Sequence, residues 1–185
     1  MRTSIGYESP LGVITLASAD GVSLTGARIE GLVLAGDLDG GPAGPERDDL
    51  DDGGEVPEIL QRACDWLDRY FAGARPDVAE IPLDPPGTAF RRDVWRAVAA
   101  IPNGQVATYG EVAADIARER GIAKMSARAV GGAASHNPIP IFIPCHRVVA
   151  ANGLGGYGNC LRLKVELLQH EGVDLTGIDL ERTGL

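Results

Sequence analysis

Cys145 and His146 stand side by side, followed by Arg147, directly after PIPIFIP (residues 138–144). A thiol attacks as the thiolate, and a nearby cation or proton acceptor raises the thiolate population at neutral pH. The three prolines exclude a helix and indicate a short, buried, extended piece that would hold Cys145 rigidly. Adjacent residues of an extended chain point to opposite sides, so His146 needs a turn or a bridging water to reach the sulfur. The alternative is that Cys145 is a small core residue, as most free cysteines are.

Two short helices are predicted upstream of this segment. Thr108-Tyr109-Gly110-Glu111 is a capping box that opens a helix ending near Gly121, and Ser126 can cap a second helix, SARAVGGAAS. Such a helix-turn-helix binds DNA in many proteins, but it is also a common packing unit. A third helix, capped by Thr88, is expected to precede the pair and to end before Pro102.

The charge is divided unequally between the two halves of the chain. Residues 1–85 carry 6 Lys and Arg against 17 Asp and Glu, whereas residues 91–164 carry 10 against 4. Only the second half therefore suits an anionic partner. The alternative is that the segregated charge only keeps two surfaces soluble.

The fold class that positions these residues is α+β. The first domain, 1–85, is predicted to be a small antiparallel β-sheet with one helix, and the second, 86–185, to be mainly helical and to contain the helix-turn-helix. Strands are expected over 12–17, 22–29 and 32–34, and a helix is expected from Pro57 to Gly73. The acidic stretch 36–58 reads as a solvated loop, and the proline-rich IPLDPPG (81–87) as the domain boundary. A closing helix over 161–171 is expected to turn Leu161, Val165 and Leu168 inward.

Composition narrows the function classes further. Three cysteines are too few for a disulfide framework and badly spaced for zinc, so we expect a reduced cytoplasmic protein with no metal. The longest apolar run is far shorter than the ~20 residues of a membrane helix, and no secretory signal is visible.

The string IPCHRV (143–148) resembles the active-site signature of the O6-alkylguanine-DNA alkyltransferases. The resemblance extends from about 88 to 172 through FRRDVWRAVAAIPNGQVATYGEVA, SARAVGGA, the Asn137-Pro138 step and LLQHEG. The front half is similar only through SPLG (9–12) and its strand pattern; in the family this domain is ribonuclease H-like. The resemblance implies direct-reversal repair, in which the alkyl group of O6-alkylguanine, and of O4-alkylthymine, passes to Cys145. The protein would be consumed in one turnover and would need no cofactor.

The resemblance also implies a role for each matching catalytic residue. Cys145 would accept the alkyl group, and His146 would take its proton through a water. Glu171 would orient the imidazole, although a solvated helix end is the alternative for this residue. Tyr109 would donate its hydroxyl to the guanine ring; a packed core tyrosine is the alternative.

The implied partner is double-stranded DNA bearing alkylated guanine, bound by a monomer in the minor groove with little sequence specificity. Arg128 would fill the gap left by the rotated nucleotide; an exposed helix arginine is the alternative. The helix face around Arg128 would consist of small residues: Ser126, Ala127, Gly131 and Gly132.

The pocket is expected to be formed by Asn137, Val148, Tyr157 and Gly158. Asn137 would bond across the turn before the active-site segment, and glycines would keep the pocket wall thin, leaving room for bulky alkyl groups. Three features depart from the family: about five extra residues near ARERGIAKM (117–125), Asn159-Cys160 where glycines are common, and the acidic stretch. Rival functions are a sensor without alkyl transfer, which Cys145 argues against, a transcription regulator and a thiol hydrolase.

Overall fold

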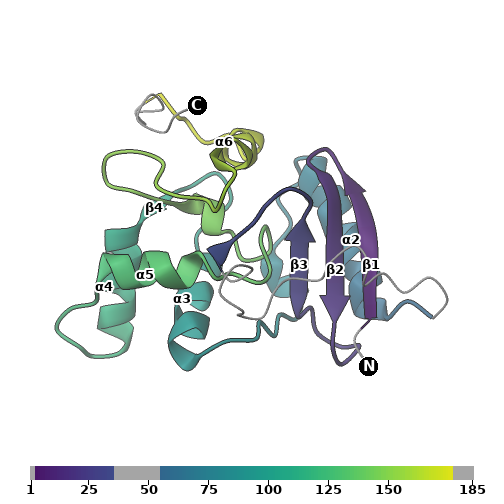
Figure 1. Ribbon diagram of the computed structural model, residues 1–185, viewed down its shortest axis with the longest axis horizontal. Helices are drawn as coiled ribbons and strands as arrows, with labels where there is room; N and C mark the ends of the chain where they lie inside the picture. Colours follow the sequence, from purple (N-terminus) through teal and green to yellow (C-terminus); the bar gives the residue numbers. More distant parts are fainter. Residues whose placement is uncertain (1–2, 36–54, 177–185) are drawn as a thin grey trace.

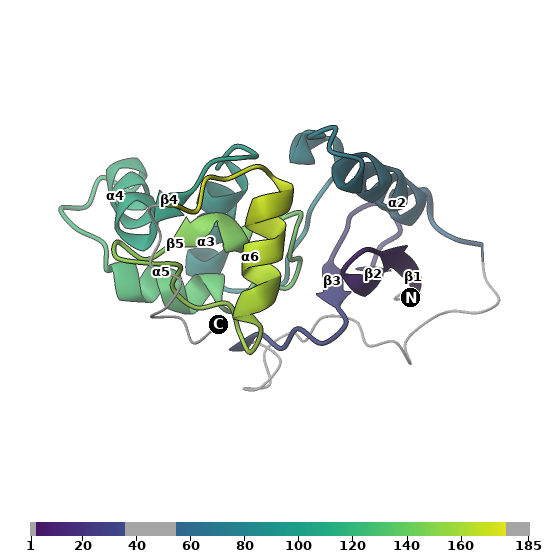
Figure 2. The same cartoon turned by 90° about the horizontal axis from the view of Figure 1, so that it is seen from above.

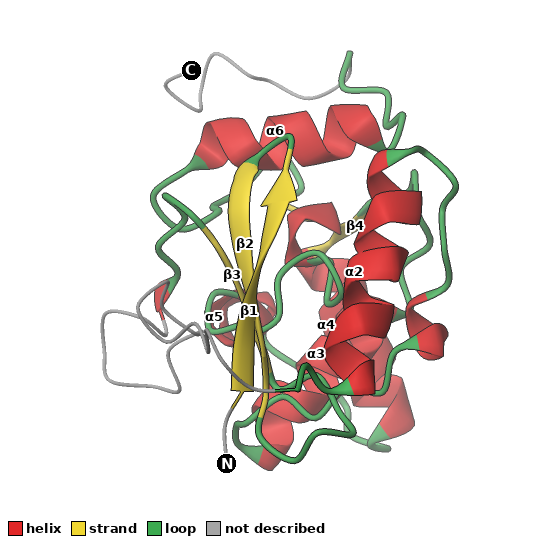
Figure 3. Ribbon diagram, turned by 90° about the vertical axis from the view of Figure 1, so that its right-hand side faces the viewer, coloured by secondary structure: helices red, strands yellow, loops and turns green. Residues whose placement is uncertain are grey.

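The computed structural model describes residues 3–35 and 55–176. Its front half is an antiparallel sheet in the order β1-β2-β3, comprising β1 (Thr3–Ser9), β2 (Gly12–Ser18) and β3 (Gly26–Ile29). The central strand β2 is the apolar GVITLAS and is the most buried of the three. Helix α2 (Glu58–Phe71) runs alongside β1 and β2 and covers them with its apolar side (Figure 3).

The predicted strand over 12–17 is confirmed as β2, but the other strand predictions need correction. Strand 22–29 is shorter than predicted, because Asp20 accepts hydrogen bonds from the amides of Val22 and Ser23 and holds them in a turn. Residues 32–34 are not a strand; they leave the sheet altogether. Strand β1 was not predicted. Of the acidic stretch 36–58, residues 36–54 lie outside the described residues.

The helix predicted from Pro57 is confirmed. Pro57 is the residue before α2, where its missing N–H costs no hydrogen bond, and Gly73 follows the helix with a φ of 80°. The helix buries the apolar residues whose helical spacing predicted it, namely Ile59, Ala63, Trp66, Leu67 and Tyr70, and it also buries Leu60.

The second half is mainly helical, as predicted. Its elements are α3 (Ala89–Ala99), β4 (Ala107–Thr108), α4 (Tyr109–Glu119), α5 (Ala127–Ala134), β5 (Val148–Val149) and α6 (Leu161–His170). The predicted caps of the three helices are present: Thr88 and Ser126 each accept from a first-turn amide, and Thr108 and Glu111 form the reciprocal capping box. Two short 3-10 turns are also present. The first, η2 (Val78–Glu80), lies in the front half, and the second, η3 (Cys145–Arg147), lies in the second half.

The buried face of α6 differs from the prediction. Leu168 is buried, but Leu161 and Val165 are only partly covered, and the fully inward residues are Leu163, Lys164, Leu167 and Leu168. The buried stripe of α6 is rotated from the predicted one because Lys164 is itself buried, at 0% exposure. A charged residue is not counted in an apolar pattern, so the pattern could not locate this stripe.

The two halves lie side by side (Figures 1 and 2), and buried apolar residues of both form one hydrophobic core. The amide of Ala27 in β3 donates to the carbonyl of Pro138 over 2.9 Å, and Leu24 pairs with Leu83 of the proline-rich segment. The apolar segment before Cys145 is therefore packed between the sheet and the helices. Among the described residues, no helix is long and apolar enough to cross a membrane, and no group of three metal-binding side chains is assembled.

Candidate active site and nucleic-acid interface

Asn137 fixes the segment that presents Cys145. Its side-chain oxygen accepts from the Ile139 amide at 3.0 Å, while its Nδ2 donates to the Ile143 carbonyl at 2.7 Å. The same Nδ2 lies 3.1 Å from the Cys145 sulfur. The predicted hydrogen bond across the turn is therefore present, and Asn137 also offers a donor that stabilises negative charge on the thiol.

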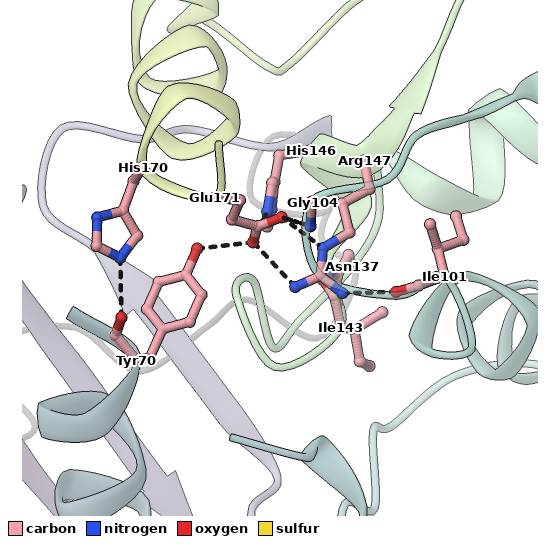
Figure 4. Close-up of polar contacts among 9 residues, drawn as sticks. All are labelled: Tyr70, Ile101, Gly104, Asn137, Ile143, His146, Arg147, His170 and Glu171. Atoms are coloured by element: carbon pink, nitrogen blue, oxygen red, sulfur yellow. Dashed lines mark hydrogen bonds and ion pairs between the residues drawn. The ribbon is translucent and has the colours of Figure 1, made fainter. Parts of the chain in front are cut away.

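A single 3-10 turn over Cys145–Arg147 separates the Cys145 side chain, which contacts Asn137, from the side chains of the next two residues. His146 and Arg147 both reach Glu171, the residue that follows α6 (Figure 4). His146 Nε2 lies 2.8 Å from Glu171 Oε1, and Arg147 donates from Nε over 2.8 Å and from Nη2 over 2.9 Å. Glu171 is only 2% exposed, so the reading of this residue as a solvated helix end is wrong.

Burial and the partner carboxylate set the protonation states of this cluster. Hydrogen bonds from His146 and Arg147 hold the pKa of Glu171 well below its ordinary value, although burial opposes them. Burial lowers the pKa of His146, so the imidazole is neutral near pH 7 and donates Nε2–H to the carboxylate. Its other nitrogen, Nδ1, is buried and has no hydrogen-bond partner among the described residues. His146 Nδ1 can therefore accept a proton, but it makes no hydrogen bond to the Cys145 sulfur.

Opposing effects act on the ionisation of the Cys145 thiol. Burial raises its pKa, and the Asn137 hydrogen bond and the positive charge of Lys164 act in the opposite direction. A buried thiol that has both a donor amide and a cation beside it can release its proton when the proton has an acceptor.

Cys145 opens into a cavity of about 210 Å³. Tyr109, Tyr157 and Gly158 line this cavity as the resemblance implied, together with Gly131 at the edge of α5. Burial raises the pKa of Tyr109 and keeps its hydroxyl protonated, able to donate to a ligand. Asn137 and Val148, which were also expected to form the pocket, are buried but do not line this cavity; Val148 lies in β5, where its backbone pairs with Ala107 of β4.

Two members of the site, Lys164 and Tyr70, were missed from the sequence. Lys164 Nζ donates to the carbonyls of Val148 and Leu154, both at 2.6 Å, and so ties β5 and the glycine-rich loop NGLGGYG (152–158) to α6. Tyr70 of α2 donates its hydroxyl to Glu171 Oε1 at 2.8 Å, which links the front half to the Glu171 cluster. The Tyr70 contact spans 101 residues and the Lys164 contacts span 16 and 10, and the apolar pattern of the sequence marks neither side chain.

The predicted binding face lies on α5, next to the mouth of the cavity. Ser126, Ala127, Arg128 and Gly132 are exposed, and Gly131 is partly covered by Tyr109. The turn between α4 and α5 borders a groove of about 990 Å³ that includes the cations Arg118, Lys124 and Arg128. Residues 117–125, where the extra residues were noted, supply Arg118 and Lys124 to this groove.

Comparisons with known proteins agree over most of the chain. Residues 5–85 match the ribonuclease-like domain of 6-O-methylguanine DNA methyltransferase, and residues 89–173 match its DNA binding domain. A methylated-DNA--protein-cysteine methyltransferase of Mycolicibacterium paratuberculosis is 40% identical over 177 residues, covering 93% of this chain and 96% of the relative. The counterpart from Methanosarcina acetivorans is 38% identical, covering 90% of this chain and 96% of the relative.

Solved structures give the same result. The crystal structure of Mycobacterium tuberculosis OGT in complex with DNA is 36% identical, has a TM-score of 0.68 and covers 92% of both chains. The α+β fold predicted from the sequence is thus confirmed by a structure of the same architecture. With both domains matched and the cysteine site assembled between them, the chain belongs to the methylated-DNA--protein-cysteine methyltransferase family.

Proposed function

We propose that this protein repairs DNA by transferring the alkyl group of O6-alkylguanine irreversibly to Cys145, once per protein molecule. The observation that carries the proposal is the position of the Cys145 sulfur. It opens into a small cavity, receives a hydrogen bond from Asn137, and has the His146–Glu171 pair behind it. The volume of the cavity is smaller than the roughly 300–1,000 Å³ that is typical of sites for drug-sized ligands. This small volume suits one base with a small substituent.

The transfer is a single in-line displacement. The Cys145 sulfur forms a bond to the alkyl carbon while the bond from that carbon to guanine O6 breaks and its electron pair passes to the base. The thiol proton goes through a water to His146 Nδ1, whose imidazolium Glu171 stabilises. Tyr109 donates a hydrogen bond to the departing guanine and so stabilises its developing negative charge. The thioether has no route to hydrolysis, so each protein molecule acts once.

The target atom is stacked inside a duplex, so the nucleotide must rotate out to reach the sulfur. The exposed Arg128 at the first turn of α5 is suited to fill the vacated space while its charge remains near phosphates. The small residues of α5 allow it to enter the minor groove. Such binding depends mainly on phosphate charge and weakens as salt is raised.

The proposal is tested by mixing the protein with a duplex oligonucleotide containing O6-methylguanine and measuring both products. We expect the protein to gain the mass of one methyl group in place of a hydrogen, and the oligonucleotide to contain guanine. The Cys145→Ala variant should bind the duplex and leave both masses unchanged. Binding without any mass change in the wild-type protein would instead identify a lesion sensor.

A further inference from the structure

The segment that follows β3 leaves the sheet and crosses to the helical half, where it runs close to α5 (Figures 1 and 2). Its backbone is bonded there at more than one point. The Ala35 amide donates to the carbonyl of Ser135 at the end of α5 over 2.9 Å, and the Val33 carbonyl accepts from the amide of Asn159 over 3.2 Å. Residues 31–35, here called the front segment, are therefore attached to the walls of the Cys145 cavity.

The side chain of Asn159 completes this attachment. Its Oδ1 accepts from the Val33 amide at 2.8 Å, and its Nδ2 donates to the Gly31 carbonyl at 3.2 Å. Together with its backbone N–H, Asn159 makes three hydrogen bonds to the front segment. A glycine at this position could make only the backbone bond. The departure from the family pattern at Asn159 thus has a specific structural consequence.

Gly158 allows the front segment to approach this closely. A Cβ on Gly158 would overlap the Val33 carbonyl oxygen and would stand 3.2 Å from Leu34 Cδ2. The glycine therefore faces the front segment, not open space. The expectation that glycines here leave room for bulky alkyl groups does not take this segment into account.

Leu34 brings the front segment into the cavity itself. It is 6% exposed, belongs to the same hydrophobic cluster as Cys145, and lines the cavity of about 210 Å³ with Tyr157 and Gly158. An alkyl carbon that reaches the Cys145 sulfur must lie inside this cavity. The size of the group it carries is limited by the side chains around it.

We propose that Leu34 is a specificity-determining residue, placed by Asn159, that closes the alkyl pocket and restricts transfer to small alkyl groups. The pocket is then built from both halves of the chain, and the front half takes part in substrate choice. This inference rests on the proposed function, because it concerns the group that Cys145 accepts.

The test compares transfer rates from O6-methylguanine and O6-benzylguanine in the same duplex sequence, followed by intact mass of the full-length protein. Leu34→Ala should raise the benzyl-to-methyl rate ratio by about tenfold, because a wall reduced by a few methyl groups changes discrimination on this scale. Leu34→Phe should lower the ratio. The control is Leu11→Ala, a partly buried leucine of the front half that does not line the cavity, and it should leave the ratio unchanged.

Asn159→Ala tests the attachment separately, with Asn152→Ala as its control in the same loop, where Asn152 is exposed. Asn159→Ala should also raise the ratio, and Asn152→Ala should not. A ratio that is the same in wild type, Leu34→Ala and Leu34→Phe, while each still accepts methyl, would overturn the inference and leave the proposed function standing. Absence of methyl transfer in the wild-type protein would instead refute the proposed function.

Discussion

Replacing Glu171 with glutamine removes the one carboxylate that His146, Arg147 and Tyr70 share. The amide group keeps the shape of the side chain but has no charge. Its NH₂ group would face the N–H and O–H donors of the cluster, with which it cannot form hydrogen bonds. The Arg147 side chain is 9% exposed and would be left as a buried cation without its partner. Breaking a buried ion pair from one side typically costs about 3–5 kcal/mol.

For a protein of this size, that loss corresponds to a decrease in melting temperature of roughly 6–20 °C. The same substitution should slow alkyl transfer by at least about tenfold, because His146 loses the group that orients it and stabilises its protonated form. Thermal and urea unfolding measure the first effect, and the rate of mass gain measures the second. Glu111→Gln is the matched control, since Glu111 is an exposed carboxylate whose pKa is also lowered, by hydrogen bonds at the α4 cap.

The pH dependence gives an independent check on Glu171. Folding lowers the pKa of Glu171, so its stabilisation is complete above the unfolded-state value of about 4.3 and is lost as the pH falls through the lower folded-state value. The free energy of unfolding of the wild type should therefore decrease below about pH 4.3 more steeply than that of Glu171→Gln. Parallel curves, or a difference under about 1 kcal/mol at pH 7, would refute the role assigned to the Glu171 cluster.

Three further substitutions test other parts of the site. Tyr70→Phe removes a hydrogen bond to a buried carboxylate and should lower the free energy of unfolding by about 1.5–3 kcal/mol in urea titrations; an unchanged midpoint and slope would contradict this. Lys164→Met removes a cation that lowers the pKa of Cys145, so the pH profile of the transfer rate should move to higher pH, and a shift to lower pH would be inconsistent with that electrostatic effect. Arg128→Ala should slow transfer from duplex DNA by about tenfold and leave transfer from free O6-methylguanine base unchanged, since only the duplex requires a rotated nucleotide. Equal slowing with both substrates would place Arg128 in the chemistry instead.

Local signals allowed the sequence to predict the helices and their ends. Thr88, Thr108 and Ser126 each accept from an amide three residues away, so their function as caps is encoded within a few residues. The apolar stripe of α2 is similarly visible in its spacing. Strand β1, TSIGYES, was missed because one side of this edge strand is open to solvent and its apolar residues are few.

The candidate site was predictable where a motif or family resemblance marked the residue, as at Cys145 and His146. Contacts that depend on the packing of distant elements were not. The hydroxyl of Tyr70 meets Glu171 across 101 residues, and Leu34 reaches the cavity because Asn159 holds Val33 across 126 residues. Neither pair carries a pattern in the chain, since each arises only when the sheet and the helical half are packed together.

Locating the transferred group on the protein is the decisive measurement. After reaction with excess O6-methylguanine duplex under reducing conditions, peptide mass spectrometry should find one methyl group per chain, on the sulfur of Cys145. Cys64 and Cys160 should remain as free thiols. A methyl group on Cys160, or the repair of more than one lesion per protein molecule, would contradict the proposed single irreversible transfer to Cys145.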